Sequence, residues 1–143
     1  MSMKQISVFV ENKPGRLAEV TGLISKANID IRALSIADTT NFGILRLIVD
    51  QPDRAAEVLR EGGFTVSITD VMGIVVKDTP GGLYPAIQAL SDEGVTVEYM
   101  YAFVNSPKDE AYVILRIEDT DRAIDILNRN HVPLVDPQTL YAM

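Results

Sequence analysis

Hydrophobic and polar positions near the start of the chain follow two different periods. Over residues 6–11 apolar and more polar positions alternate, which is typical of a strand with one buried face. After Pro14, apolar residues recur at helical spacing from Leu17 to Ala27, which indicates one stripe of an amphipathic helix. The pattern therefore predicts a strand that leads directly into a helix.

Two further strands follow this helix. Alternation resumes over residues 29–36, but its parity shifts, and this shift predicts a bulge near Arg32 or Ala33. A turn is expected around residues 38–41, and residues 44–49 form the next alternating segment. These two segments predict a hairpin.

A second helix and a fourth strand complete the first half of the chain. Pro52 is placed to open the helix, Gly62 and Gly63 can end it in a left-handed cap, and residues 64–68 alternate again. The order strand, helix, strand, strand, helix, strand predicts a ferredoxin-like unit, because each helix then makes a right-handed crossover between parallel strands. Such a unit has a four-stranded antiparallel sheet with two helices on one face.

The same pattern starts again at Val71. The loop at residues 11–17 recurs at 77–83, an offset of 66, and the sequence Ile-Leu-Arg at 44–46 recurs at 114–116, an offset of 70. The changes in offset fall at an expected hairpin and an expected loop, where insertions are tolerated. The chain is therefore interpreted as a duplication.

We predict an α+β protein of two tandem ferredoxin-like (βαββαβ) units, with a first domain at residues 1–70 and a second at 71–143. No linker separates the copies, because the alternation of apolar residues keeps the same parity from Phe64 to Val76, through the boundary. In the second copy Asp119 is a suitable N-cap and Asn130 a suitable C-cap. The last strand contains Pro133, which fits an edge strand.

Composition narrows the function classes. The net charge of −7 and the pI near 4.6 argue against nucleic acid as a partner, since nucleic-acid-binding domains carry a basic face. The chain has no cysteine, and its one histidine, His131, is expected at the surface after a helix end. No catalytic set, metal site or cofactor is predicted. No signal peptide and no apolar stretch of membrane-spanning length is visible, so we expect a cytoplasmic protein with no membrane partner.

The two Pro-Gly loops, at residues 11–17 and 77–83, are the strongest candidates for a functional site. Each proline is placed where a first helical residue can lack its N–H, and each following glycine lets backbone donors approach a ligand over the helix N-terminus. Such a terminus favours an anion. The alternative is that Pro-Gly only marks the change from strand to helix.

The sequence Asn12-Lys13-Pro14-Gly15-Arg16-Leu17, followed by Asn28-Ile29, resembles the ACT domain, a regulatory module of amino-acid metabolism. The resemblance covers nearly the whole chain twice and extends to the ACT modules of phosphoglycerate dehydrogenase and aspartokinase. It implies a free amino acid held between two ACT units whose sheets lie side by side. In serine-binding relatives two asparagines contact the ligand, and they correspond to Asn12 and Asn28.

The resemblance implies ligand contacts in both loops and at the starts of both second strands. These residues are Asn12, Lys13, Gly15, Arg16, Leu17, Asn28, Ile29, Ile31, Asp78, Thr79, Gly81, Gly82, Leu83, Gly94, Val95, Val97 and Tyr99.

The second copy departs from the first at two of these positions. Asp78 replaces the loop asparagine and can pair with an ammonium, whereas Gly94 stands where the first copy has Asn28. If the copies pair through their second strands, one site combines Asn12 and Gly15 with residues 94–99, and the other combines Asp78 and Gly81 with residues 28–32. Which site is occupied stays open.

Several of these residues also have ordinary structural interpretations. Asn12 and Asp78 are residue types that often bond their own backbone at the start of a helix. Leu17 and Leu83 fit equally well as core residues.

The leading hypothesis is a non-enzymatic regulatory protein that binds a free amino acid between ACT-like units. It is expected to form a homodimer, because the strand faces opposite the helices carry exposed apolar residues by parity. These residues are Phe9, Ile44, Ile48, Val75, Tyr112 and Ile114. The alternative is a dissociable regulatory subunit of a biosynthetic enzyme such as acetolactate synthase. A small hydrolase using Arg46 or Arg116 and an RNA-recognition module are weaker rivals. The identity of the amino acid stays open.

Overall fold

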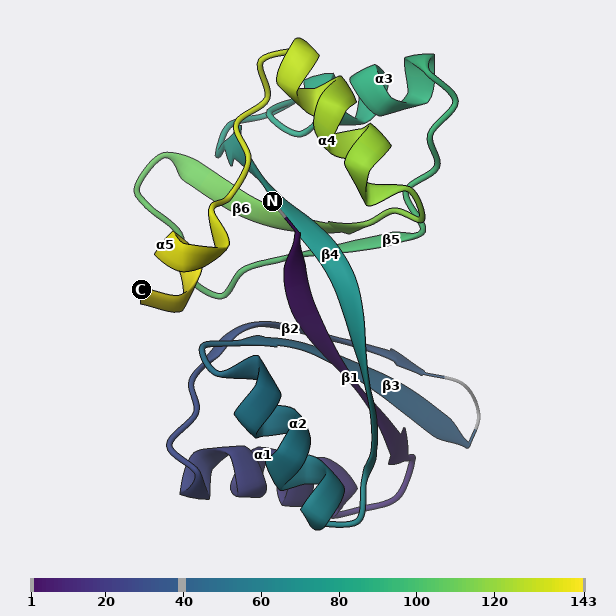
Figure 1. The fold of residues 1–143 in the computed structure, drawn as a ribbon, viewed down its shortest axis with the longest axis vertical. Coiled ribbons are helices and arrows are strands. Elements are labelled where there is room, and N and C mark those ends of the chain that lie inside the picture. Colours follow the sequence, from purple (N-terminus) through teal and green to yellow (C-terminus); the bar gives the residue numbers. More distant parts are fainter. Residues whose placement is uncertain (1, 39–40, 143) are drawn as a thin grey trace. The chain divides into compact units, whose positions relative to one another are not determined.

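The computed structural model describes residues 2–38 and 41–142, and its elements are shown in Figure 1. Contacts divide the chain into two compact units, a first of residues 4–69 and a second of residues 70–141, which Ser2 and Met3 join. The elements are β1 (Met3–Glu11), α1 (Arg16–Lys26), β2 (Ile31–Asp38), β3 (Phe42–Val49), α2 (Pro52–Glu61), β4 (Thr65–Lys77), α3 (Tyr84–Asp92), β5 (Tyr99–Ala102), β6 (Glu110–Arg116), α4 (Thr120–Arg129) and α5 (Pro137–Ala142).

In the first unit the strands lie in the order β2-β3-β1-β4, with β4 contributing its first residues. Antiparallel pairing joins β1 to β3 and β3 to β2. Helices α1 and α2 lie together on one side of this sheet (Figure 1), and their apolar stripes meet the strands in one core. Fully buried members of that core include Ile6, Val8, Ile24, Leu47 and Leu59. The ferredoxin-like fold predicted from the sequence is confirmed.

Strand β2 carries the predicted bulge. Ile31 lies opposite Val49, whereas Ala33 lies opposite Ile48, so Arg32 is the extra residue on β2. The bulge accounts for the shift in apolar parity. The turn predicted around residues 38–41 includes Thr39 and Thr40, which lie outside the described residues.

In the second unit the order is β4-β6-β5, and a short segment pairs with the other edge of β4. Ile74 and Leu134 form an antiparallel bridge. The amide of Val75 donates to the carbonyl of Pro133 at 2.9 Å, and the amide of Val135 donates to the carbonyl of Gly73 at 2.8 Å. Pro133 lacks an N–H and only accepts, which suits an edge position. This segment is the fourth strand of the second ferredoxin-like unit.

The helix ends agree with the predicted caps. The carboxylate of Asp119 accepts from the amide of Arg122 at 3.1 Å, and Asn130 is the C-cap of α4. Gly63 has φ +92°, the left-handed conformation expected after α2.

Both helices start later than predicted. Pro14 and Pro80 were expected to open their helices, but α1 begins at Arg16 and α3 at Tyr84. The cause is the glycine after each proline, since Gly15 and Gly81 have φ +88° and +80°, and a left-handed residue cannot continue a right-handed helix.

Helix α5 was not predicted. It follows the fourth strand of the second unit, and its Leu140 is fully buried. In Figure 1 it lies on the other side of β6 from α3 and α4.

Candidate functional site

The first Pro-Gly loop leaves backbone donors available at the start of α1. The amide of Arg16 donates to the carbonyl of Lys13 at 3.4 Å, and the amide of Glu19 donates to the carbonyl of Gly15 at 3.0 Å. Between them, the amides of Leu17 and Ala18 donate to no acceptor in the described residues. Two adjacent donors at a helix N-terminus suit a carboxylate or another anion.

The side chains of this loop are not used for capping. Helix α1 has no side-chain cap, and Asn12 makes no side-chain hydrogen bond within the part of the chain that the structure describes. The amide of Asn12 donates to the carbonyl of Asn41 at 2.9 Å, which ties the loop to the β2–β3 hairpin. Leu17 is 46% exposed and is therefore not a core residue. Both side chains remain available to a ligand or a partner.

The charged side chains of the same loop pair with one another. The carboxylate of Glu11 lies 2.9 Å from the Nζ of Lys13 and 3.5 Å from one guanidinium nitrogen of Arg16. Another guanidinium nitrogen of Arg16 lies 3.1 Å from the carboxylate of Glu19. The hydrogen bond from Lys13, together with the charges of Lys13 and Arg16, lowers the pKa of Glu11. The loop therefore presents backbone donors beside cations already balanced by carboxylates.

Removing Lys13 should raise the pKa of Glu11 toward its ordinary value. Because the folded-state pKa is lowered, the ionised pair contributes stability above the unfolded pKa, and this contribution is lost as the pH falls through the folded pKa. An NMR titration of the Glu11 carboxyl carbon in Lys13→Ala checks the shift. Lys26→Ala, at the other end of α1, is the control and should leave the pKa unchanged. An unchanged pKa in Lys13→Ala would contradict the pairing.

The second Pro-Gly loop is built differently. The amide of Gly82 donates to the carbonyl of Thr79 at 3.0 Å, and the amide of Tyr84 donates to the carbonyl of Gly81 at 3.2 Å. The next residue, Pro85, has no N–H to offer. Asp78 does not cap α3, which has no side-chain cap. The second loop therefore presents fewer first-turn donors than the first loop.

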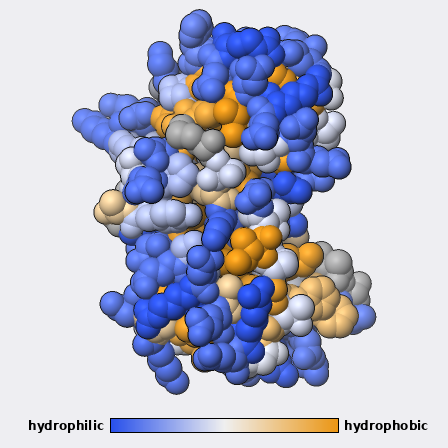
Figure 2. Space-filling model, viewed as in Figure 1, coloured by the Kyte–Doolittle hydropathy of each residue, from blue (hydrophilic) through white to orange (hydrophobic). Residues whose placement is uncertain are grey.

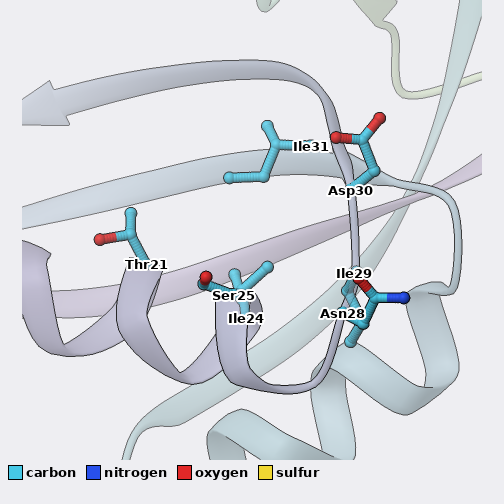
Figure 3. A pocket seen from close by; sticks show the side chains of 7 residues that line it. All are labelled: Thr21, Ile24, Ser25, Asn28, Ile29, Asp30 and Ile31. Atoms are coloured by element: carbon cyan, nitrogen blue, oxygen red, sulfur yellow. The ribbon is translucent and has the colours of Figure 1, made fainter.

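A pocket of about 300 Å³ lies at the other end of α1 (Figure 3). Thr21 and Ser25 line it from α1, and Ile31 lines it from the start of β2. Asn28 also lines the pocket, with φ +56°, and in Figure 3 its carboxamide points away from α1. Thr21 and Ser25 were missed from the sequence. Their spacing of four residues beside the apolar stripe was the available signal.

Asn12 and Asn28 lie at opposite ends of α1. The helix has 11 residues, which corresponds to about 16 Å. A free amino acid is too small to reach both side chains within one unit. A site that uses both asparagines must therefore take them from two ACT units.

The other predicted contact residues divide between pockets and cores. Gly94 and Val95 line a cavity of about 420 Å³, whereas Thr79, Gly81 and Gly82 line another of about 380 Å³ together with His131. His131 is exposed after the C-cap of α4, as predicted.

Five of the predicted residues lie in or against the hydrophobic cores, and Ile31 and Val95, which also line pockets, are two of them. Ile29 is only 6% exposed and belongs to the core of the first unit. Leu83 and Val97 are half-buried against the core of the second unit. Tyr99 begins β5 opposite Arg116.

The rival hydrolase hypothesis gains no support from Arg116. Its guanidinium pairs with Glu98 at 3.2 Å and donates to the carbonyls of Asp70 and Ile117, both at 3.1 Å. No group of acidic or histidine side chains that could hold a metal ion occurs in residues 2–38 and 41–142. Among the described residues, no helix is long and apolar enough to cross a bilayer.

Comparison with known proteins identifies the family. Residues 1–143 match the ACT domain pair, and the chain belongs to this family. The crystal structure of protein BT0572 from Bacteroides thetaiotaomicron is similar, with 45% identity, a TM-score of 0.93, and coverage of 100% of this chain and 98% of that chain. A comparison with curated proteins gave no match.

Two regulatory subunits of aspartate kinase share the fold. The ligand-free form from Thermus thermophilus has a TM-score of 0.65 at 17% identity, with coverage of 89% of this chain and 91% of that chain. The subunit from Thermus flavus has a TM-score of 0.61 at 16% identity, with coverage of 90% and 92%. At these identities the likeness concerns the fold.

Proposed function

We propose that this ACT domain pair is a non-enzymatic regulatory protein that binds a free amino acid at the loop from Asn12 to Leu17. The observation that carries the proposal is the pair of available amide donors at Leu17 and Ala18, next to left-handed Gly15. These donors suit the α-carboxylate, and the carboxamide oxygen of Asn12 suits the α-ammonium. A cytoplasmic setting, where free amino acids are made, fits this role.

The site is completed by a second ACT unit. Asn28 lies too far from Asn12 to contact the same ligand within one unit. It would therefore contribute to a site whose Pro-Gly loop belongs to another ACT unit. Strand β2 is the edge of the first unit's sheet, and its Leu34 and Ile36 are 46% and 54% exposed. We propose that this edge meets an ACT unit of another copy, which brings a Pro-Gly loop to Asn28.

A partner enzyme is the second candidate. The two aspartate kinase relatives are described as regulatory subunits, and this chain covers 91% and 92% of their length. The same architecture would serve a dissociable regulatory subunit of another biosynthetic enzyme, such as acetolactate synthase. Affinity capture from cell extract, with and without added amino acids, separates this role from a free-standing sensor.

A thermal-shift screen over the twenty amino acids tests the proposed function. A ligand at a hundredfold excess over its Kd should stabilise the protein by about 2.7 kcal/mol. For a chain of this size each kcal/mol corresponds to about 2–4 °C in Tm. If none of the twenty amino acids raises the Tm at millimolar concentration, the result contradicts amino-acid binding.

A homodimer is the expected assembly, and light scattering should give twice the chain mass of 15.7 kDa. The edge residues Leu34 and Ile36 supply one apolar surface. Phe9 and Ile44, 46% and 37% exposed on the helix-free face, supply another. Figure 2 shows apolar side chains gathered beside the end of the β2–β3 hairpin. Ile48 and Ile114, expected on this face by parity, are fully buried and do not contribute.

Ile36→Lys should shift the protein toward monomer, because it places a charge in the apolar edge. Ile68→Lys is the control, since Ile68 is 40% exposed on β4, at the opposite edge of the first unit's sheet. A monomer mass for the unmodified protein at micromolar concentration would contradict the assembly.

A further inference from the structure

The cavity of about 380 Å³ in the second unit differs in charge from the two other cavities described above. It lies between the second Pro-Gly loop and the segment that follows α4, and we name it the loop cavity. None of the described residues that line it is acidic, whereas its lining includes Lys77 and His131. Acidic residues line both other cavities. In a chain of net charge −7, a cavity whose ionisable groups are all basic favours an anion.

Both basic residues are specific to the second copy. Lys77 is the first residue of its Pro-Gly loop, and the counterpart in the first copy is Glu11, which has the opposite charge. His131 follows Asn130, the C-cap of α4, in the same way as Gly63 follows the C-cap of α2. The first copy therefore has neither positive group at these two positions.

His131 occupies a backbone conformation that glycine adopts more easily. Its φ is +58°, and Gly63 in the first copy has φ +92°. A side chain brings a steric cost to this left-handed conformation, and glycine avoids it. The imidazole of His131 makes no hydrogen bond or ion pair within the described residues, so no contact of that kind offsets the cost. A ligand in the loop cavity would supply such a contact.

A backbone donor also faces the loop cavity. The amide of Val75 donates to the carbonyl of Pro133 at 2.9 Å, at the edge of β4 away from β6. The amide of Asp78 donates to the carbonyl of Asp109 at 3.0 Å, on the side of β6. Amides alternate between the two sides of a strand, so the amide of Lys77 points to the same edge as that of Val75. It donates to no backbone acceptor there within the described residues.

Apolar side chains form the remaining wall. Val76 and Ala86 are 9% and 1% exposed, and Val132 is half-buried. A cavity of this size suits a small molecule. The lining thus fits an anion with a short apolar side chain. A zwitterionic amino acid fits less well, because no carboxylate among the described lining residues can accept from its α-ammonium.

We propose that the loop cavity binds a small 2-oxo acid with an apolar side chain. The carboxylate accepts from the ammonium of Lys77 and from the imidazole of His131, and the 2-oxo oxygen accepts from the amide of Lys77. The side chain packs against Val76 and Val132. Neither Lys77 nor His131 is among the amino-acid contacts predicted from the sequence. The proposal does not depend on amino-acid binding at the first Pro-Gly loop.

Isothermal titration of the full chain with pyruvate, 2-oxobutanoate and 4-methyl-2-oxopentanoate tests this site. At least one of the three should bind. Acetate, or the matching carboxylate without the 2-oxo oxygen, should bind about tenfold more weakly or worse, because the amide of Lys77 then lacks an acceptor. The matching amino acid at equal concentration should not displace the 2-oxo acid.

Lys77→Gln should weaken binding of the 2-oxo acid by about tenfold or more, because it removes a charged hydrogen bond. Lys26→Gln is the matched control, since Lys26 is an exposed lysine at the end of α1, and it should change the affinity by less than about twofold. His131→Gly should weaken binding as Lys77→Gln does, without lowering the Tm, because glycine suits the left-handed position. A histidine with a purely structural role would lose no affinity on this change.

The proposal is overturned if no 2-oxo acid binds, if acetate binds as tightly, or if the matching amino acid displaces the 2-oxo acid. It is also overturned if either Lys77→Gln or His131→Gly leaves the affinity unchanged, or if Lys26→Gln weakens binding equally. Binding of an amino acid but of no 2-oxo acid would overturn it and leave the function proposed above intact. Binding of a 2-oxo acid but of no amino acid would support the loop cavity and count against the first Pro-Gly loop.

Discussion

Gly82→Ala should destabilise the protein by about 3 kcal/mol or more. A Cβ on Gly82 would lie 2.0 Å from the carbonyl oxygen of Lys77 and 3.2 Å from that of Thr79. Both obstacles are backbone atoms, so no side chain can move aside. The loop would have to open and give up the hydrogen bond from Gly82 to Thr79. Chemical denaturation at equilibrium measures the change.

Gly22→Ala is the control for this substitution. Gly22 lies within α1, and a Cβ there meets no atom within 4 Å. Alanine should stabilise this helix by about 0.5–1 kcal/mol, because glycine carries a larger entropic cost in a helix. Equal stability of Gly82→Ala and the unmodified protein would show that the second loop is not packed as the structure has it.

Gly15→Ala should weaken amino-acid binding by about tenfold or more, since the new methyl group enters the space beside the donors of Leu17 and Ala18. That space is open, as no atom lies within 4 Å of the added Cβ. The left-handed backbone of Gly15, with φ +88°, also means that alanine costs about 1 kcal/mol of stability.

Gly63→Ala separates these two effects. Gly63 has φ +92° and equally open surroundings, but it follows Gly62, the C-cap of α2, and belongs to neither loop. Both variants should lose similar stability, and only Gly15→Ala should lose affinity in calorimetry. If the two variants bind the amino acid with equal affinity, the first Pro-Gly loop only connects β1 to α1 and does not bind the ligand.

The duplicated fold could be predicted because the separate signals in the sequence agreed with one another. Strand parity, helical spacing and turn residues indicated the same element order, and the recurrence of the Pro-Gly loop and of Ile-Leu-Arg placed the second copy. A bulge near Arg32 or Ala33 could also be predicted, because an extra residue reverses the apolar parity of everything that follows it, and the structure has it at Arg32.

The irregular parts of the fold could not be predicted in the same way. Glycine accepts several backbone conformations, so its presence did not show that Gly81 would be left-handed or that α3 would begin only at Tyr84. The length of β5 was hidden for a similar reason. Residues 95–97 alternate as a strand should, but the bonds that would close them onto β6 are missing.

The candidate site was only partly visible in the sequence. The first Pro-Gly loop was identified, but whether its amides were available depended on the carbonyls of Lys13 and Gly15, which follow no sequence pattern. The separation of Asn12 from Asn28 follows directly from the length of the intervening helix.

Binding of a free amino acid at the first Pro-Gly loop can be tested residue by residue. The test is two-dimensional ¹⁵N NMR of the labelled chain, titrated with the amino acid that raises the Tm most. We expect the largest shifts at the amides of Leu17 and Ala18, with changes at Asn12, Gly15 and Asn28. A saturable titration that leaves the amides of residues 12–18 unmoved would contradict the account.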